Sequence, residues 1–218
     1  MKSWEKQWGC HGSLSSPFSF SLLIEMGKKI LELFKGTGSI GKLFEQNGWE
    51  VISVDVLEKF QPTICCNVMD LKYEQWPPGY CDVIWASPPC THYSRARTRA
   101  KTPRDLEGSD AIVMRVREII EYLKPTLHFM ENPATGLLRS RPCMLDMPTP
   151  LFVDYCMYGL PYRKRTAIWT NAKTLELSLC NKACGHYENG KHIQSAQRGK
   201  FKLEDVYRIP AKLCDVFF

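Results

Sequence analysis

The sequence contains no apolar run long enough to cross a lipid bilayer, so a membrane-spanning helix is not expected. Residues 18–24 form a short apolar stretch, but no small-residue cleavage site follows it, and we do not expect a secreted protein. Apolar and charged residues make up 44% and 24% of the chain, which is typical of a globular protein and excludes a disordered one. The 218 residues predict one domain with room for a small appendage.

The sequence also shows no regular pairing of cysteines, although it has ten of them. Because they are scattered through a chain with enzyme-like α/β patterning, we expect reduced thiols in a cytoplasmic protein and no disulfide framework. The formal net charge of +6 favours a polyanionic partner such as nucleic acid.

A glycine turn lies between two predicted strands near the start of the chain. Residues 29–34 predict a strand, residues 39–47 a helix, and residues 50–55 a second strand that ends at Asp55. The turn has the pattern Gly-x-Gly-x-x-Gly, which together with the acid is typical of a nucleotide-cofactor half-site. This pattern alone does not distinguish a dinucleotide from S-adenosylmethionine.

A third short strand is predicted over residues 64–68 and is followed by Asp70. The Asp70 carboxylate could meet the adenine of either cofactor. It could equally be the N-cap of a helix that begins at Leu71. Both interpretations stay open on these residues.

The most informative stretch is residues 82–94. Its first half predicts a buried strand, which Pro88 and Pro89 end because neither can donate to a sheet ladder. Cys90 follows at once, and the basic segment 95–101 comes after it. A thiol among arginines at the carboxyl end of a strand should have a lowered pKa and a reactive thiolate. The alternative is a small, buried and inert cysteine.

A second strand end carries an acid. A helix is predicted from a cap at Ser109 to residue 123, and a strand follows over residues 126–130, ending in Glu131-Asn132-Pro133. In a parallel sheet this end lies at the same edge as Cys90. Burial and a neighbouring thiolate would favour the protonated form of Glu131, which could then donate a proton. The alternative is a cap or turn residue.

Two further features lie in the last third of the chain. Residues 153–171 predict a strand, a turn and a strand, and the Arg163-Lys164-Arg165 cluster is either a solvated loop or a clamp on an anionic group. After this block the sequence offers four candidate zinc ligands at irregular spacing, namely Cys180, Cys184, His186 and His192. Residues 207–214 predict a short closing helix that begins at a proline.

Four blocks occur in a diagnostic order: residues 33–38, 87–94, 131–133 and 163–165. With them the chain resembles the cytosine-5 DNA methyltransferase family, most closely its compact branch in phages and other viruses. The resemblance implies an α/β, Rossmann-like methyltransferase fold with a mostly parallel seven-stranded sheet and a small Cys/His-containing C-terminal appendage. We therefore expect a flexible extension over residues 1–25, a catalytic domain over 26–171, and a reduced recognition region with the final helix over 172–218.

The resemblance also implies a role for each matching residue. S-adenosylmethionine would be bound by Phe34, Gly36, Gly38, Asp55, Asp70 and Pro89. Cys90 would attack C6 of a flipped cytosine, Glu131 would hydrogen-bond the base, and Arg163 and Arg165 would complete the catalytic set. The DNA backbone would be contacted by Ser94, Arg95, Arg97, Arg99 and Lys101.

The chain departs from the family pattern in its details. Thr91 stands where the family commonly has glutamine, and residues 161–165 lack the glutamine of the usual arginine motif. Only a short segment follows Asn171 where larger members carry a target-recognition domain. Sequence recognition would then fall to the Cys/His appendage or to a partner protein. A monomer in the cytoplasm, that of a bacterial host for a phage enzyme, is expected. The alternatives are an RNA (tRNA) methyltransferase and a catalytically silent nucleic-acid-binding relative.

Overall fold

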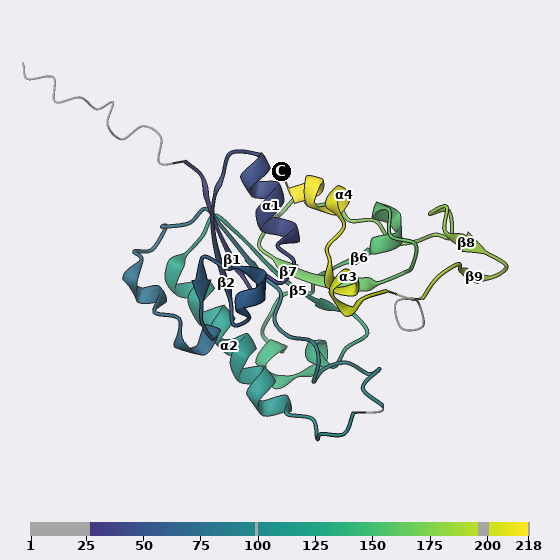
Figure 1. The fold of residues 1–218 in the computed structure, drawn as a ribbon, viewed down its shortest axis with the longest axis horizontal. Coiled ribbons are helices and arrows are strands. Elements are labelled where there is room, and N and C mark those ends of the chain that lie inside the picture. Colours follow the sequence, from purple (N-terminus) through teal and green to yellow (C-terminus); the bar gives the residue numbers. More distant parts are fainter. Residues whose placement is uncertain (1–26, 99, 196–200, 218) are drawn as a thin grey trace, which may run out of the picture.

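A single seven-stranded sheet forms the centre of the molecule (Figure 1). The computed structural model describes residues 27–98, 100–195 and 201–217, so the predicted extension over residues 1–25 lies outside the described residues. The strand order is β3-β2-β1-β4-β5-β7-β6. The strands are β1 (Lys29–Leu33), β2 (Glu50–Asp55), β3 (Ile64–Cys65), β4 (Val83–Ala86), β5 (Leu127–Pro133), β6 (Leu151–Asp154) and β7 (Arg165–Thr170).

All neighbouring strands from β3 to β5 are parallel, and β7 is antiparallel to both β5 and β6. This mostly parallel arrangement confirms the predicted fold class. Because the central strands are covered on both faces, they read as nearly continuous apolar runs, and every residue of β4 is buried. The carboxyl ends of β1, β2, β4 and β5 therefore meet at one edge of the sheet, where ligands bind in open α/β proteins.

Helices cover the two faces of the sheet. On one face α2 (Leu106–Leu123) packs with residues such as Val113 and Ile119 against β1, β4 and β5. On the other face lie α1 (Ser39–Gln46) and α4 (Ala211–Cys214). No helix in the part of the chain that the structure describes is long and apolar enough to cross a membrane.

The remaining elements are short. The helix α3 (Leu203–Tyr207) precedes α4, and a separate hairpin is made by β8 (Tyr187–Glu188) and β9 (Lys191–His192). Figure 1 shows this hairpin projecting from the β6 end of the molecule. The 3-10 turns are η2 (Glu58–Phe60), η3 (Val68–Asp70), η4 (Tyr73–Gln75), η5 (Leu138–Ser140), η6 (Pro142–Met144), η7 (Tyr155–Tyr158) and η8 (Asp215–Phe217).

The start of α2 differs from the prediction. The helix begins at Leu106, because the Asp105 side chain accepts a hydrogen bond from the Gly108 amide at 2.8 Å and so acts as the N-cap. Ser109 is buried inside the first turn, where its hydroxyl donates to the Asp105 carbonyl oxygen at 2.7 Å. The predicted cap at Ser109 was therefore wrong, since an aspartate upstream satisfies the free amides.

Candidate active site

The glycine turn after β1 is held by the acid at the end of β2. Phe34, Gly36 and Gly38 all have positive φ, at 62°, 51° and 67°, which is a left-handed conformation that a non-glycine residue such as Phe34 rarely adopts. The Asp55 carboxylate accepts hydrogen bonds from the Gly36 amide at 2.9 Å and from the Leu57 amide at 2.8 Å. The predicted turn and its acid are thus directly linked.

A buried acid that the sequence analysis missed lies behind this turn. Glu32 in β1 is 3% exposed, and burial raises the pKa of its carboxyl to about 7, against the lowering influence of the Gly41 and Ile40 amides. A Cβ on Gly41 would lie 2.5 Å from Glu32 Oε2, so a larger residue at this position would force the carboxylate to shift. The signal in the sequence was a single acid inside the apolar strand of residues 30–33.

An open cleft of about 520 Å³ lies beyond the end of β4, and Pro89 is one of its walls. Its other lining residues are Met69, Thr91, His92, Asp105, Gly108, Ser109, Ala111 and Ile112. Of the predicted cofactor residues only Pro89 lines this cleft.

Asp70 neighbours the cleft residue Met69. It is exposed and is the last residue of η3. Asn67 is the N-cap there, since its side chain accepts from the Met69 amide. The alternative that Asp70 caps a helix was therefore wrong.

The loop that carries Cys90 is pinned on both sides. The Asn132 side-chain amide donates to the Pro88 carbonyl oxygen at 2.9 Å in a buried contact between the ends of β5 and β4. The amides of Tyr93 and Ser94 donate to the Cys90 carbonyl oxygen at 3.1 and 2.9 Å, so Cys90 begins a tight turn. The prediction that this cysteine follows a buried strand at its carboxyl end is confirmed.

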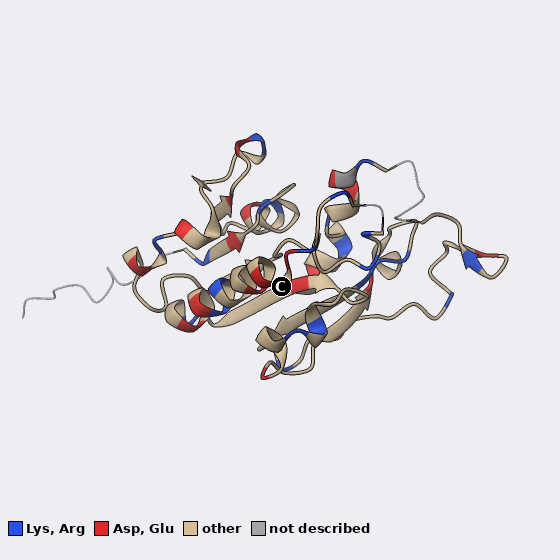
Figure 2. Ribbon diagram, turned by 90° about the horizontal axis from the view of Figure 1, so that it is seen from below, with Lys and Arg blue, Asp and Glu red and all other residues tan. Residues whose placement is uncertain are grey.

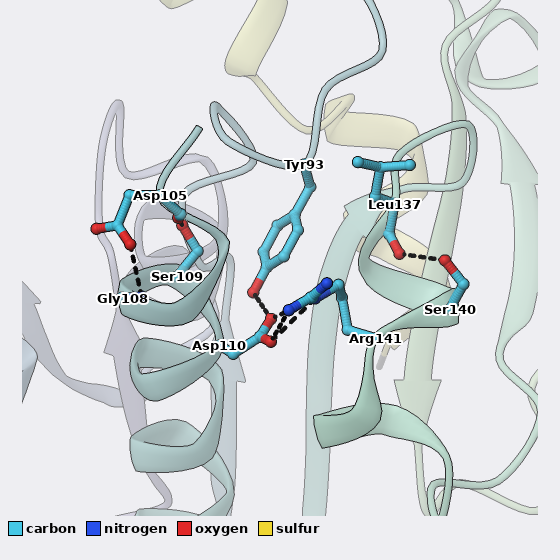
Figure 3. A network of polar contacts seen from close by, with 8 residues as sticks. All are labelled: Tyr93, Asp105, Gly108, Ser109, Asp110, Leu137, Ser140 and Arg141. Carbon is cyan, nitrogen blue, oxygen red and sulfur yellow. Dashed lines mark hydrogen bonds and ion pairs between the residues drawn. The ribbon is translucent and has the colours of Figure 1, made fainter. Parts of the chain in front are cut away.

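Behind this turn, Tyr93 anchors the loop to α2 and to the segment after β5 (Figure 3). Its buried hydroxyl donates to Asp110 Oδ1 at 2.8 Å, and the Arg141 guanidinium donates to both oxygens of the same carboxylate. Burial alone would raise the pKa of Asp110, but the bonds from Arg141 and Tyr93 lower it. The Leu137 amide donates to the Tyr93 carbonyl oxygen at 2.9 Å. This network holds the Cys90 turn rigidly and was not predicted.

Glu131 lies in β5, next to the Cys90 loop, and its side chain is almost fully buried. Tyr155 donates its hydroxyl to Glu131 Oε1 at 3.3 Å, and Lys164 Nζ lies 3.8 Å from the same oxygen. The Lys164 ammonium also lies 4.9 Å from the centroid of the Tyr155 ring. The residues that face Glu131 thus include a lysine that the sequence analysis did not single out.

The prediction of a lowered pKa for Cys90 was wrong. Burial raises the pKa of this thiol, and the negative charge of Glu131 raises it further, while Lys164 acts in the opposite direction. The basic segment 95–101 was expected to lower this pKa, but Arg97 of that segment donates to Thr102 and Pro103, and the charged groups that act on Cys90 are Glu131 and Lys164. Arg104, further along the loop, donates to the carbonyl oxygens of His92 and Ser94. Neighbours in the sequence are therefore not its electrostatic partners.

The basic segment after Cys90 presents only part of its charge. Arg95 and Lys101 are exposed, whereas Ser94 accepts from the Ala96 amide and Arg97 is turned inward as described. Arg99 lies outside the described residues. Arg95 lines a second cleft of about 610 Å³, together with Ala134, Thr135, Gly136, Arg139 and Ser140. Figure 2 shows the described lysines and arginines distributed along the ribbon over several loops and helices.

Arg163 and Arg165 are directed at a different carboxylate from the one that Lys164 faces. Arg165 makes a bidentate pair with the fully buried Asp154, at 3.0 and 2.7 Å, and Arg163 lies 4.0 Å from Asp154. Asp154 also accepts from the Cys180 amide at 2.9 Å. The two predicted arginines are thus brought together by Asp154, whereas Lys164 faces Glu131.

A Cys/His cluster lies close to Asp154. Potential ligand atoms of Cys156, Cys180, Cys184 and His192 all lie within 4.8 Å of one another. Three of the four were predicted. Cys156 was missed, and His186 is outside this group of the described residues.

A family model and a related protein both assign the chain to the same family. A model of the C-5 cytosine-specific DNA methylase family matches residues 28–141. A probable DNA (cytosine-5)-methyltransferase of frog virus 3 (isolate Goorha) is 34% identical over 192 residues, which cover 78% of this chain and 87% of the viral protein.

Solved structures show the same fold at lower identity. A protein encoded within an E. coli prophage and assigned as a DNA modification methyltransferase matches with a TM-score of 0.51 and 18% identity, over 70% of this chain and 49% of that one. The Entamoeba histolytica methyltransferase EhMeth matches with a TM-score of 0.50 and 17% identity, over 87% of this chain and 65% of EhMeth. This chain thus spans about half to two thirds of these structures. The chain belongs to the C-5 cytosine-specific DNA methylase family.

Proposed function

We propose that this protein transfers a methyl group from S-adenosylmethionine to C5 of cytosine in DNA. The observation that carries the proposal is the juxtaposition of Cys90 and Glu131 at the adjacent ends of β4 and β5, with Lys164 beside them. A buried thiol, a buried carboxyl group and a cation at one sheet edge are the groups that covalent catalysis on a pyrimidine ring requires.

The residues at the ends of β1 and β2 fit the cofactor. Phe34 and the two turn glycines present backbone at positive φ, which allows a ligand to approach closely. Asp55 holds this turn and lies where ribose hydroxyls are bound in related half-sites. When bound, S-adenosylmethionine supplies an electrophilic methyl group.

The chain's own residues act on the base. Cytosine cannot be reached inside a stacked duplex, so the reacting base is flipped out. The Cys90 thiol gives its proton to solvent and its sulfur forms a bond to C6, while the electron pair of the C5–C6 double bond is delocalised over C5, C4 and N3. Glu131 takes up a proton when the base binds, and in this protonated form it donates a hydrogen bond to N3 that stabilises the added electron density. C5 then takes the methyl group from S-adenosylmethionine, the rest of which leaves as the neutral thioether. The C5 proton then passes to solvent, and the electron pair of the broken C–H bond re-forms the C5–C6 double bond and expels the Cys90 thiolate.

Lys164 assists the first of these steps. Its ammonium is the cation that lowers the pKa of Cys90 against burial and Glu131. Its distance of 3.8 Å from Glu131 Oε1 also fixes that carboxyl group beside the base. Arg163 and Arg165 support the base indirectly, since their pairing with Asp154 fixes the strand end next to Lys164.

Contacts to the DNA backbone are assigned to Ser94, Arg95 and Lys101, with Arg97 shaping the loop from within. Backbone contacts of this kind are independent of sequence and weaken with salt. Sequence readout is assigned to the short region after residue 171 or to a partner protein. We also propose that the Cys/His cluster in this region holds a metal ion.

The test is covalent trapping with the full chain. DNA that contains 5-fluorocytosine cannot release the C5 substituent as a proton, so wild-type protein and S-adenosylmethionine should give a complex that survives denaturation. Cys90→Ser should give none. Trapping on tRNA in place of DNA would assign the chain to RNA, and binding without trapping on either would identify a silent binding protein. Either result would overturn the proposal.

A further inference from the structure

We infer that Cys156, Cys180, Cys184 and His192 form a zinc centre that fastens residues 178–193 to the catalytic sheet. The separations match tetrahedral zinc. His192 Nε2 lies 3.5 Å from Cys180 Sγ and 3.6 Å from Cys184 Sγ. Bond lengths of about 2.3 Å to sulfur and about 2.0–2.1 Å to nitrogen give a tetrahedral S···N separation of about 3.6 Å.

The ligand that completes the set comes from the turn that directly follows a strand of the catalytic sheet. Cys156 is buried in η7, which directly follows β6. The other three ligands lie in the region after β7. A metal bound by all four therefore joins two parts of the chain, and it does not merely close a local loop.

Residues 178–180 lie against the end of β6 before they reach the cluster. The Asp154 amide donates to the Ser178 carbonyl oxygen at 3.1 Å, and the Ser178 amide donates to the Tyr158 hydroxyl at 3.0 Å. The Cys180 amide donates to Asp154 Oδ2 at 2.9 Å. These hydrogen bonds hold Cys180 next to Cys156.

Two tight turns deliver the remaining ligands. Lys182 and Gly185 have φ of 76°, and they reverse the chain between and after the two cysteines of the segment. The β8–β9 hairpin turns at Asn189 and Gly190, both of positive φ, and pairs Tyr187 with His192. The hairpin thus places His192 beside Cys180 and Cys184.

The chemistry of the donors favours zinc. Three thiolates and one imidazole are a common set for closed structural zinc sites, and a fully occupied tetrahedron leaves no open position for catalysis. The Lys182 amide points at Cys180 Sγ at 3.4 Å, as expected around a metal-bound thiolate. Arg163 and Arg165 lie beside the cluster through Asp154 and balance its negative charge.

Apart from these hydrogen bonds the segment has no core of its own, since none of residues 178–193 is fully buried. Leu179 and Ile193 are about half exposed, and the two-stranded hairpin is separate from the main sheet. Two-stranded hairpins are marginally stable alone, and small regions without a core depend on metals or disulfides. The free energy of zinc binding would therefore appear as local folding stability.

The first experiment measures zinc in the purified full chain. We expect one equivalent by elemental analysis and a tetrahedral thiolate spectrum after Co²⁺ exchange. Cys156→Ser should weaken zinc binding by at least about 100-fold in a chelator competition, as ligand loss should exceed the 10–100-fold typical of outer-shell changes. The controls His186→Ala and Cys65→Ser should bind zinc as the wild type does.

The second experiment is hydrogen exchange with and without zinc. The amides of Cys180, Lys182 and Ile193 should lose protection when zinc is removed, whereas those of β1 and β4 should not change. The inference is overturned by a wild-type chain without stoichiometric zinc, by unchanged affinity in Cys156→Ser, or by an intact mass showing a disulfide among these cysteines. None of these readouts depends on Cys90, so failure here leaves the methyltransferase proposal standing, and failed trapping leaves the zinc centre standing.

Discussion

Replacing Glu32 by glutamine should stabilise the protein at alkaline pH and change it little at acidic pH. The folded pKa of about 7 lies some 2.5 units above the ordinary value of 4.5. At about 1.4 kcal/mol per pKa unit, ionising this buried carboxyl destabilises the folded state by ~3 kcal/mol. Because the folded pKa is raised, the stabilising contribution is complete below pH 4.5 and is lost as the pH rises through 7.

The assay is urea unfolding at pH 5 and pH 8. At pH 5 the wild-type Glu32 side chain is largely neutral in the folded state, as its glutamine replacement always is. The difference in the free energy of unfolding between variant and wild type at this pH therefore reports packing and hydrogen bonding at Gly41 and Ile40. Between pH 5 and pH 8 that difference should shift in favour of Glu32→Gln by about 2–3 kcal/mol. The matched control is Glu121→Gln, an exposed glutamate of α2.

The reasoning is refuted if Glu32→Gln and Glu121→Gln show the same pH dependence. That result would mean that the carboxyl behind the glycine turn is ionised in the folded protein without cost. A loss of stability common to both pH values, added to the expected pH-dependent shift, would show that glutamine fits poorly beside Gly41, and the shift itself would still report the ionisation.

Three further outcomes are expected. Cys90→Ser should abolish methyl transfer, measured with labelled S-adenosylmethionine and duplex DNA, and a variant as fast as the parent would show that the nucleophile is another group. Lys164→Gln should raise the pKa of Cys90, moving the pH profile of iodoacetamide alkylation to higher pH; an unmoved profile would contradict the assigned role. Tyr93→Phe should lower the free energy of unfolding by about 0.5–1.5 kcal/mol, measured in urea, because the part-buried Asp110 Oδ1 loses one of its two donors and keeps Arg141. Tyr122→Phe, which removes a hydroxyl that donates to the Glu74 carbonyl oxygen at 3.4 Å in an exposed contact, is the matched control expected to cost less.

Most of the fold could be predicted because its signals are local. The apolar runs of β1, β2 and β4, the glycine turn and the proline corner before Cys90 each act within a few residues of one another. The order of Cys90 and Glu131 along the chain then places both at one edge, since parallel strands share their carboxyl ends. Asp105 shows the limit of such signals, because two nearby residues can each cap a helix and only the folded backbone selects one.

The errors concern partners that are remote in sequence. The pKa of Cys90 depends on its burial and on Glu131. The nearby Arg97 and Arg104 donate hydrogen bonds within their own loop. Cys156 could not be grouped with Cys180 and the other ligands from spacing, because the pairing of β6 with β7 and the return of residues 178–180 bring them together. A metal set divided between two segments leaves no compact motif.

The side chains just before and at the start of β7 point alternately toward the candidate active site and toward the inferred zinc centre. Successive side chains of a strand point to opposite faces, and here Lys164 reaches Glu131 while Arg165 reaches Asp154. Asp154 in turn accepts the amide of Cys180, a ligand of the inferred zinc centre. Loss of the metal should therefore release Arg165 first and affect Lys164 only through the shared backbone. We therefore expect that iodoacetamide alkylates Cys90 in the zinc-free chain with the same pH profile as in the wild type. A shifted profile would mean that loss of zinc moves Lys164 together with Arg165.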